Sequence, residues 1–118
     1  MKAKKIKSFR RDAGVVAQSA INFSDPLSLP WNGEVVTHVK WFMGSRNRRP
    51  DTDNVLASLK AMFDGFEDAG IVKNDDQFIH LPVTIDRDND DPRVDVQLWD
   101  IEGCELHIGI KKERLNGE

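Results

Sequence analysis

The chain has 118 residues, of which 39% are hydrophobic and 31% are charged, and its formal net charge is −3. This length suits one domain with a single core, and the sequence contains no apolar run of membrane length. The single cysteine, Cys104, excludes a disulfide framework within the chain, and the basic N-terminus lacks the apolar stretch of a secretion signal, so a cytoplasmic protein is predicted.

The net charge conceals an asymmetry between the two parts of the chain. Residues 1–50 contain ten lysines and arginines against three acidic residues, whereas residues 51–118 contain seven against seventeen. A basic half can face phosphates while an acidic half binds metal ions. The asymmetry is therefore compatible with a nucleic-acid partner.

Residues 2–22 are predicted to form a helix, because apolar residues recur along them at helical spacing. The first half of this helix, residues 1–11, carries six cations and no acid. Two interpretations stay open: these cations contact a phosphate backbone, or this end of the helix is solvated and frayed. The six cations are Lys2, Lys4, Lys5, Lys7, Arg10 and Arg11.

After a loop over residues 26–33, the clearest strand signal covers residues 34–43. Side chains such as Val35 and Val39 alternate there with polar ones. The strand leads into an arginine-rich loop, in which we expect the side chains to bind phosphates. These arginines are Arg46, Arg48 and Arg49.

A second helix is predicted between Asp53 and Gly70, with Gly70 as the glycine that follows its last turn. At about 100° per residue, Asp53, Lys60 and Asp64 fall within about 40° of one another on the side opposite the apolar face. The predicted apolar face comprises Val55, Leu56, Leu59, Met62, Phe63 and Phe66.

Asp51 and Asp53 flank Thr52 just before this helix. In extended backbone, alternate side chains point the same way, so the two carboxylates would converge and repel each other unless a cation lies between them. Oxygen ligands of this kind suit magnesium or manganese. The alternative is that both acids only cap the helix and interact with its dipole.

Residues 78–85, 94–101 and 104–110 are predicted strands, and residues 86–93 form an acidic turn. Calcium binding by that turn is excluded because Asp91 and Gln97 occupy the EF-hand positions that require glycine and glutamate. The polar tail, residues 111–118, is expected to fray. The sequence thus predicts an α/β (α+β) single domain over residues 1–118, with a mixed four-stranded sheet, two helices on one face, and the order α-β-α-β-β-β.

Four separated stretches between residues 46 and 86 resemble the signature of the RusA-type endodeoxyribonucleases, the Holliday-junction resolvases of bacteria and phages. The resemblance implies magnesium-dependent cleavage of branched double-stranded DNA, such as four-way junctions, by a homodimer, with manganese as a substitute metal. The stretches are Arg48-Arg49-Pro50-Asp51-Thr52-Asp53-Asn54, Lys60-Ala61-Met62-Phe63-Asp64, Ala69-Gly70-Ile71-Val72 and Asp75-Asp76-Gln77-Phe78.

The same resemblance assigns roles to individual residues. The catalytic and metal-binding carboxylates correspond to Asp51, Asp53 and Asp76, and the catalytic helix lysine corresponds to Lys60. Residues that could support these ligands from an outer layer are Asp75, Asp64 and Asn54.

The sequence departs from the family pattern at two points. Lys60 follows Asp53 by seven residues instead of four, which places it one helical turn further along the same face. The family's opening Leu-Pro-x-Pro-Pro-Ser-x-Asn strand is missing before the first helix.

Two alternative functions remain open at this point. The chain could be an inactive module that binds branched DNA, or a metal-dependent phosphodiesterase that acts on another nucleic acid. For the homodimer, we expect the apolar residues of strand 104–110 and of the N-terminal helix to form the subunit contact.

Overall fold

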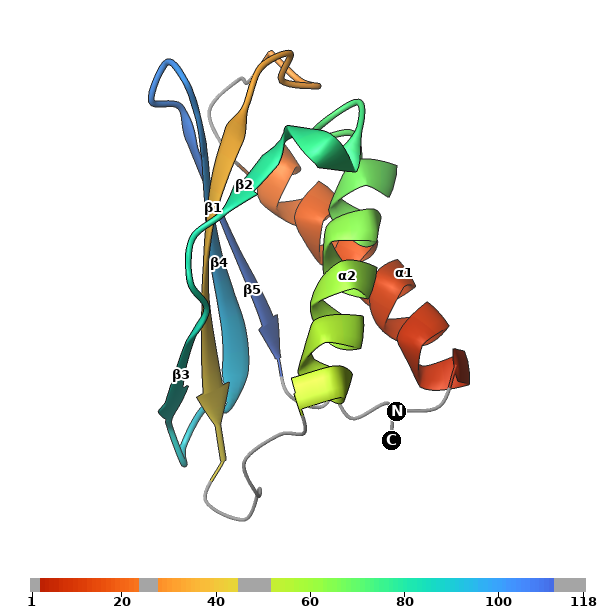
Figure 1. Cartoon of the computed structure of the whole chain (residues 1–118), viewed down its shortest axis with the longest axis vertical. Coiled ribbons are helices and arrows are strands. Elements are labelled where there is room, and N and C mark those ends of the chain that lie inside the picture. The colour runs from red at the N-terminus through yellow and green to blue at the C-terminus, as the bar shows by residue number, and fades with distance from the viewer. Residues whose placement is uncertain (1–2, 24–27, 45–51, 112–118) are drawn as a thin grey trace.

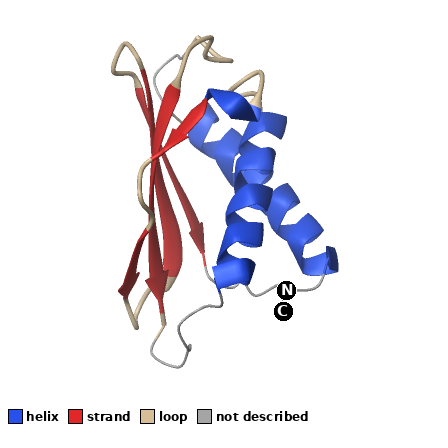
Figure 2. Cartoon of the chain, viewed as in Figure 1, coloured by secondary structure: helices blue, strands red, loops and turns tan. Residues whose placement is uncertain are grey.

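The computed structural model describes residues 3–23, 28–44 and 52–111. Two helices pack against one face of a mixed sheet, as the sequence predicted, and the sheet has five strands instead of the four expected (Figures 1 and 2). In chain order the elements are α1 (Ala3–Asn22), β1 (Val35–Met43), α2 (Thr52–Asp68), the 3₁₀ helix η1 (Asp75–Gln77), β2 (Phe78–His80), β3 (Thr84–Arg87), β4 (Arg93–Asp100) and β5 (Glu105–Lys111).

Strand β1 organises the sheet. On one side it pairs in parallel with both β2 and β3, and on the other it pairs antiparallel with β4, which in turn pairs antiparallel with β5. The single strand predicted over residues 78–85 is therefore interrupted at residues 81–83. Pro82 lies in this interruption and has no N–H to continue the ladder, which gives a physical reason for the break.

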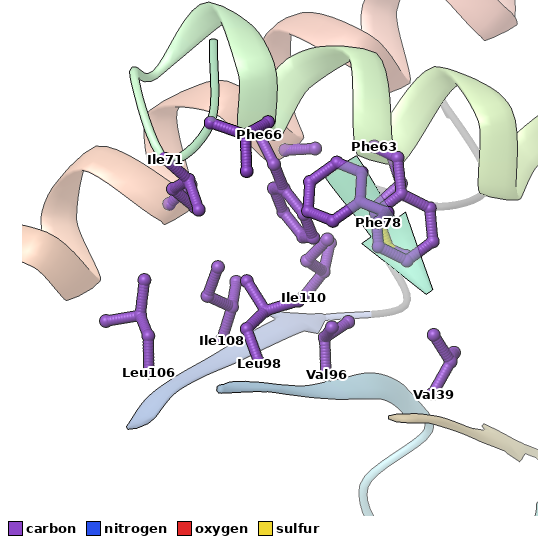
Figure 3. Close-up of a cluster of buried hydrophobic side chains, with 14 of the residues drawn as sticks. Val39, Phe63, Phe66, Ile71, Phe78, Val96, Leu98, Leu106, Ile108 and Ile110 are labelled. Carbon is purple, nitrogen blue, oxygen red and sulfur yellow. The ribbon is translucent and has the colours of Figure 1, made fainter. Parts of the chain in front are cut away.

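The core lies between the sheet and the helices, and alternate residues of β1, β4 and β5 fill its lower layer (Figure 3). Leu106, Ile108 and Ile110 are at most 2% exposed. Our expectation that this strand offers apolar surface to a second subunit is therefore wrong, because these side chains already belong to the core cluster beneath the helices, and α1 contacts β5 directly. Among described residues, the large apolar side chains that are exposed include Leu56, Ile79, Leu81 and Ile85.

Helices α1 and α2 cross where two glycines meet. A Cβ atom on Gly65 would overlap the Arg10 carbonyl oxygen, and one on Gly14 would lie 3.2 Å from the Gly65 carbonyl oxygen. Because α2 packs against α1 as well as against the sheet, its buried face is rotated relative to the face predicted from the sequence. Ser58 is 2% exposed, whereas Leu56, which was predicted to be in the core, is 60% exposed.

Gly70 ends α2 as predicted. Its φ of +88° lies in the left-handed region that glycine adopts without strain. The Ile71 N–H donates to the Phe66 carbonyl oxygen over 3.2 Å, which closes the end of the helix.

The side chain of Gln77 fixes η1 against the loop before β1. Its Nε2 atom donates to the carbonyl oxygens of Trp31 (2.7 Å) and Gly33 (2.9 Å). Its Oε1 atom accepts from the backbone N–H groups of Lys73 (2.9 Å) and Asn74 (3.0 Å). The short connection after α2 is thereby held in one place, with Asp75 and Asp76 in it.

The acidic turn before β4 is organised by a cation rather than left to solvent. The Arg93 guanidinium donates to Asp88 over 2.8 Å and to Asp95 over 3.0 Å, and it lies 4.2 Å from the centre of the Phe42 ring. The hydrogen bond from Arg93 holds the pKa of Asp88 below its usual range. Lys111 binds Asp91 over 2.8 Å, so cations from both ends of the β4–β5 hairpin balance the turn.

Candidate metal centre and nucleic-acid interface

One charged stripe of α2 carries three of the predicted site residues. Asp53, Lys60 and Asp64 are spaced by seven and four residues, which keeps them on one side of the helix. The Lys60 Nζ atom lies 3.5 Å from the Asp64 Oδ2 atom, and the Lys60 side chain is 72% exposed. From Asp53 to Asp64 the stripe extends about 16 Å along the helix axis, at 1.5 Å per residue.

The structure brings together three carboxylates at the far end of this stripe. Single oxygen atoms of Asp64, Glu67 and Asp75 lie within 4.8 Å of one another. A set of three carboxylates has the hard oxygen donors that Mg²⁺ and Mn²⁺ prefer, so its chemistry fits a divalent cation. Glu67 was not among the predicted site residues, although its spacing of three residues from Asp64 places the two side chains on the same side of the helix.

Asp76 lies in η1, and this segment is not extended backbone. In a 3₁₀ helix, successive side chains are about 120° apart, so Asp75 and Asp76 do not point in opposite directions as extended backbone would require. The Asp76 N–H donates to the Asn74 Oδ1 atom over 3.2 Å, which caps η1. Figure 1 shows η1 at the upper end of the view, beside the C-terminal end of α2, while Asp53 lies in the first turn at the lower end.

Asp53 and Asp76 are therefore held at opposite ends of α2. Asp75 of η1 lies with Asp64 and Glu67, and Asp64 is about 16 Å along the helix axis from Asp53. Within the described part of one chain, the connection after Gly70 does not return to the beginning of α2.

Several predicted residues lie outside the described part of the structure. These are Asp51 and the three arginines of the loop after β1, Arg46, Arg48 and Arg49. The side chains of Asp53, Asn54, Lys4, Lys5 and Lys7 are likewise outside the description, although their backbones belong to α2 and α1. Both helices begin, and β1 ends, at the lower end of the view in Figure 1.

Arg10, one of the predicted phosphate-binding cations, has a partner within the fold. Its guanidinium donates to both carboxylate oxygens of Asp68, over 2.7 and 2.9 Å, and lies 4.0 Å from Asp64. This hydrogen-bonded pair raises the pKa of Arg10 and lowers that of Asp68. Arg10 thus ties α1 to α2, whereas the neighbouring Arg11 is exposed.

A cavity of about 420 Å³ opens beside the charged stripe. Its walls come from α2, β1, η1, β2 and the segment that joins β2 to β3. The side chains of Lys60, Asp64 and Asp75 contribute its charged groups, and Thr37 and His80 contribute its neutral polar groups.

His80 is packed and oriented at this cavity. Its ring centre lies 4.4 Å from that of Phe63, and its Nδ1 atom shares a hydrogen bond of 2.7 Å with the Thr37 hydroxyl. Desolvation lowers the pKa of His80, so the neutral form of the imidazole is favoured at neutral pH. The histidines at positions 38 and 107 lie on the other face of the sheet.

The described helices include none that is both long and apolar enough to cross a membrane. Comparison with known protein families shows that the model described as endodeoxyribonuclease RusA matches residues 1–99. No curated protein and no solved structure matches the chain significantly.

Proposed function

The chain belongs to the RusA endodeoxyribonuclease family, and on this premise we propose that it is a divalent-metal-dependent enzyme that resolves four-way DNA junctions by paired nicking. It would act in recombination and repair in the cytoplasm of a bacterial or phage-infected cell. The observation that carries the proposal is the family match, which spans all of the predicted catalytic residues.

We propose that Asp51 and Asp53 hold one magnesium ion at the beginning of α2, with Asp76 as a third ligand. A bound Mg²⁺ or Mn²⁺ would polarise the scissile phosphate, orient the attacking water and stabilise the leaving oxygen. Lys60, which follows Asp53 by seven residues on the same side of α2, would neutralise the charge that develops on the phosphate. The cations at the starts of α1 and of the arginine loop would hold the DNA backbone on either side.

The separation along α2 supports a site shared between two subunits. Asp75 of η1 lies beside Asp64, whose position on α2 is about 16 Å along the helix axis from Asp53, whereas metal–oxygen distances are about 2 Å. In a homodimer with two-fold symmetry, Asp76 of one subunit could approach Asp53 of the other, and the pair would contain two equivalent sites. Two sites related by a two-fold axis are what paired nicking of a four-way junction requires.

Mixing two inactive variants tests this arrangement. Asp53→Asn and Asp76→Asn are each expected to be inactive alone, but a mixed dimer contains one intact site, with Asp53 from one subunit and Asp76 from the other. On a supercoiled plasmid with an extruded cruciform, the mixture should produce nicked circles without linear product, because only one of two sites cuts. If mixing restores nothing although a tag on one variant co-purifies the other, which confirms mixed dimers, each site is built within one chain.

A specific observation favours a second location for the metal ion. The group of Asp64, Glu67 and Asp75 provides three carboxylates within one chain, with no contribution from a second subunit. Asp64 already interacts with Lys60 and Arg10, which partly balance its charge without a metal ion. For this reason we favour the start of α2, and Asp75→Asn serves below as the variant that separates the two locations.

The arginine loop is proposed to bind phosphates rather than to read bases. Arg48→Ala should therefore weaken binding to junctions of different sequence equally, and it should reduce the slope of log affinity against log salt by about one unit. Fluorescence titration of labelled junctions in EDTA at several salt concentrations measures both quantities. A changed sequence preference with an unchanged salt slope would identify the loop as a reader of bases. An inactive binding module would show the same salt slope but no cleavage with magnesium.

A further inference from the structure

The cavity beside α2 combines an apolar interior with charges on its margin. Leu59, Phe63, Val39 and Val83 line it with carbon atoms, and its volume of about 420 Å³ falls in the range of about 300–1,000 Å³ typical of small-ligand pockets. Such walls suit a flat, uncharged ring better than they suit a phosphate, because burying a charge among apolar side chains is unfavourable.

The charges on the margin also select against the DNA backbone. Asp64 and Asp75 contribute carboxylates there, and these would repel a phosphate but accept hydrogen bonds from the exocyclic amino group of a base. Lys60 offers a donor to a base carbonyl or ring nitrogen from the same side of α2. The polar groups are thus complementary to the edge of a nucleobase.

The cavity also lies where a substrate base could reach it, if the proposed function is correct. Lys60 belongs both to the cavity and to the stripe that begins at Asp53, seven residues earlier. A DNA strand cut beside Asp53 and Lys60 would pass close to the opening. Where four helical arms meet, the regular base stack is interrupted, so turning one base out of the stack costs less there than inside a duplex.

We propose that this cavity receives one unstacked base of the DNA branch point. The inference rests on the proposed junction-resolving function and adds a specific contact to it: the base lies between Leu59, Phe63 and Val83, and its polar edge meets Asp64, Asp75 and Lys60. This contact would fix the position of the branch point relative to the cutting site, in the way that bound bases position other nucleic-acid enzymes.

The test combines two changes: one base is removed from the DNA junction, and the cavity of the protein is filled by a larger side chain. Val83→Phe would extend a ring into the cavity from the β2–β3 segment, and Ile85→Phe, two residues further on, is the matched control because Ile85 is exposed and does not line the cavity. Four-way junctions are prepared in which each branch-point nucleotide in turn is replaced by an abasic residue. Their affinities are measured in EDTA, so that cleavage does not interfere.

For the wild-type protein, one abasic position is expected to weaken binding about tenfold, which corresponds to the loss of one stacked base. In Val83→Phe the same abasic replacement should have less than about a twofold effect, while Ile85→Phe should behave like the wild type. Leu56→Ala provides a second cavity variant that does not disturb the core, because Leu56 is 60% exposed, and it should also reduce the effect of the abasic residue.

Three results would overturn the inference. In the first, the wild type cuts junctions while each abasic replacement changes affinity equally in the wild type, Val83→Phe and Leu56→Ala. In that case the cavity does not bind a base, and the proposed function stands. If both cavity variants convert a dimer into a monomer on sedimentation, the cavity is a contact between two copies of the chain. If the wild type neither binds nor cuts branched DNA, the proposed function fails together with the inference.

Discussion

Asp53→Asn is expected to abolish DNA cleavage while DNA binding survives or becomes tighter. The substitution removes one proposed metal ligand and also one negative charge near the DNA backbone. Loss of a residue that merely supports a metal ligand already costs about 10- to 100-fold in metal affinity or activity, so loss of a ligand should reduce the cleavage rate at least about a hundredfold. The measurement is the single-turnover rate on a labelled four-way junction with magnesium, alongside binding in EDTA.

The stability of this variant should change little. Asparagine retains the shape of the side chain, and Asp53 lies inside the first turn of α2, so no N-cap residue is lost. The lost interaction of the acid with the helix dipole, about 0.3–1 kcal/mol, is offset in part by reduced repulsion among neighbouring acids in the metal-free protein. Urea denaturation should therefore give a midpoint close to that of the wild type, which separates loss of catalysis from loss of folding.

Asp75→Asn is the matched control, because it removes a carboxylate from the group at the other end of the same helix stripe. We expect it to be the milder change. If Asp75→Asn abolishes cleavage and Asp53→Asn leaves magnesium-dependent cutting intact, the ion binds to Asp64, Glu67 and Asp75, and the assignment of the start of α2 is wrong.

Gly65→Ala is expected to destabilise the fold by about 2 kcal/mol or more. At an exposed helical position this change would stabilise, since alanine favours the helix over glycine by about 1 kcal/mol. Here the added methyl group would overlap the Arg10 carbonyl oxygen and lie 3.1 Å from the Ala13 Cβ atom, so the two helices must separate. Overpacking of this kind typically costs about 1–3 kcal/mol. Urea denaturation measures the free energy of unfolding.

Gly14→Ala is the graded comparison on the facing helix. Its added Cβ atom would lie 3.2 Å from the Gly65 carbonyl oxygen, a tight contact that a shift of a few tenths of an ångström relieves. It should therefore cost less than Gly65→Ala. Equal stability of Gly65→Ala and the wild type would mean that α1 and α2 do not cross at these glycines in solution.

Local patterns in the sequence were sufficient for the main elements of the fold. The alternation around Val35 and Val39 predicted β1, and the helical spacing before Gly70 predicted α2, because each pattern reports the burial of its own segment. The rotated face of α2 could not be predicted in the same way. Leu56, which was predicted to be in the core, is exposed, and Ser58 is buried instead, because α1 approaches α2 through Gly14 and Gly65, which lie far apart in the sequence.

For the candidate site, the sequence predicted which residues take part but not how they are arranged. The identities of the acidic residues come from a local resemblance, but their arrangement depends on where the connection after Gly70 leads. A connection of this length could turn toward either end of α2. The hydrogen bonds from Gln77 of η1 to the carbonyl oxygens of Trp31 and Gly33 hold it at the C-terminal end. Sequence alone therefore did not distinguish a site within one chain from a site between two.

The position of η1 depends on the side-chain amide of Gln77, so the conversion of this one amide into a carboxylate would disturb it. All four of its hydrogen-bonding positions are used: two donated bonds to backbone carbonyls and two accepted bonds from backbone N–H groups. Hydrolysis of the amide during ageing would create a glutamate of nearly the same shape, whose second oxygen would face the carbonyl oxygens of Trp31 and Gly33. Two attractions would become two repulsions, and η1 would separate from the loop. An old preparation could thus lose the position of Asp75 and Asp76 with every carboxylate of the site chemically intact.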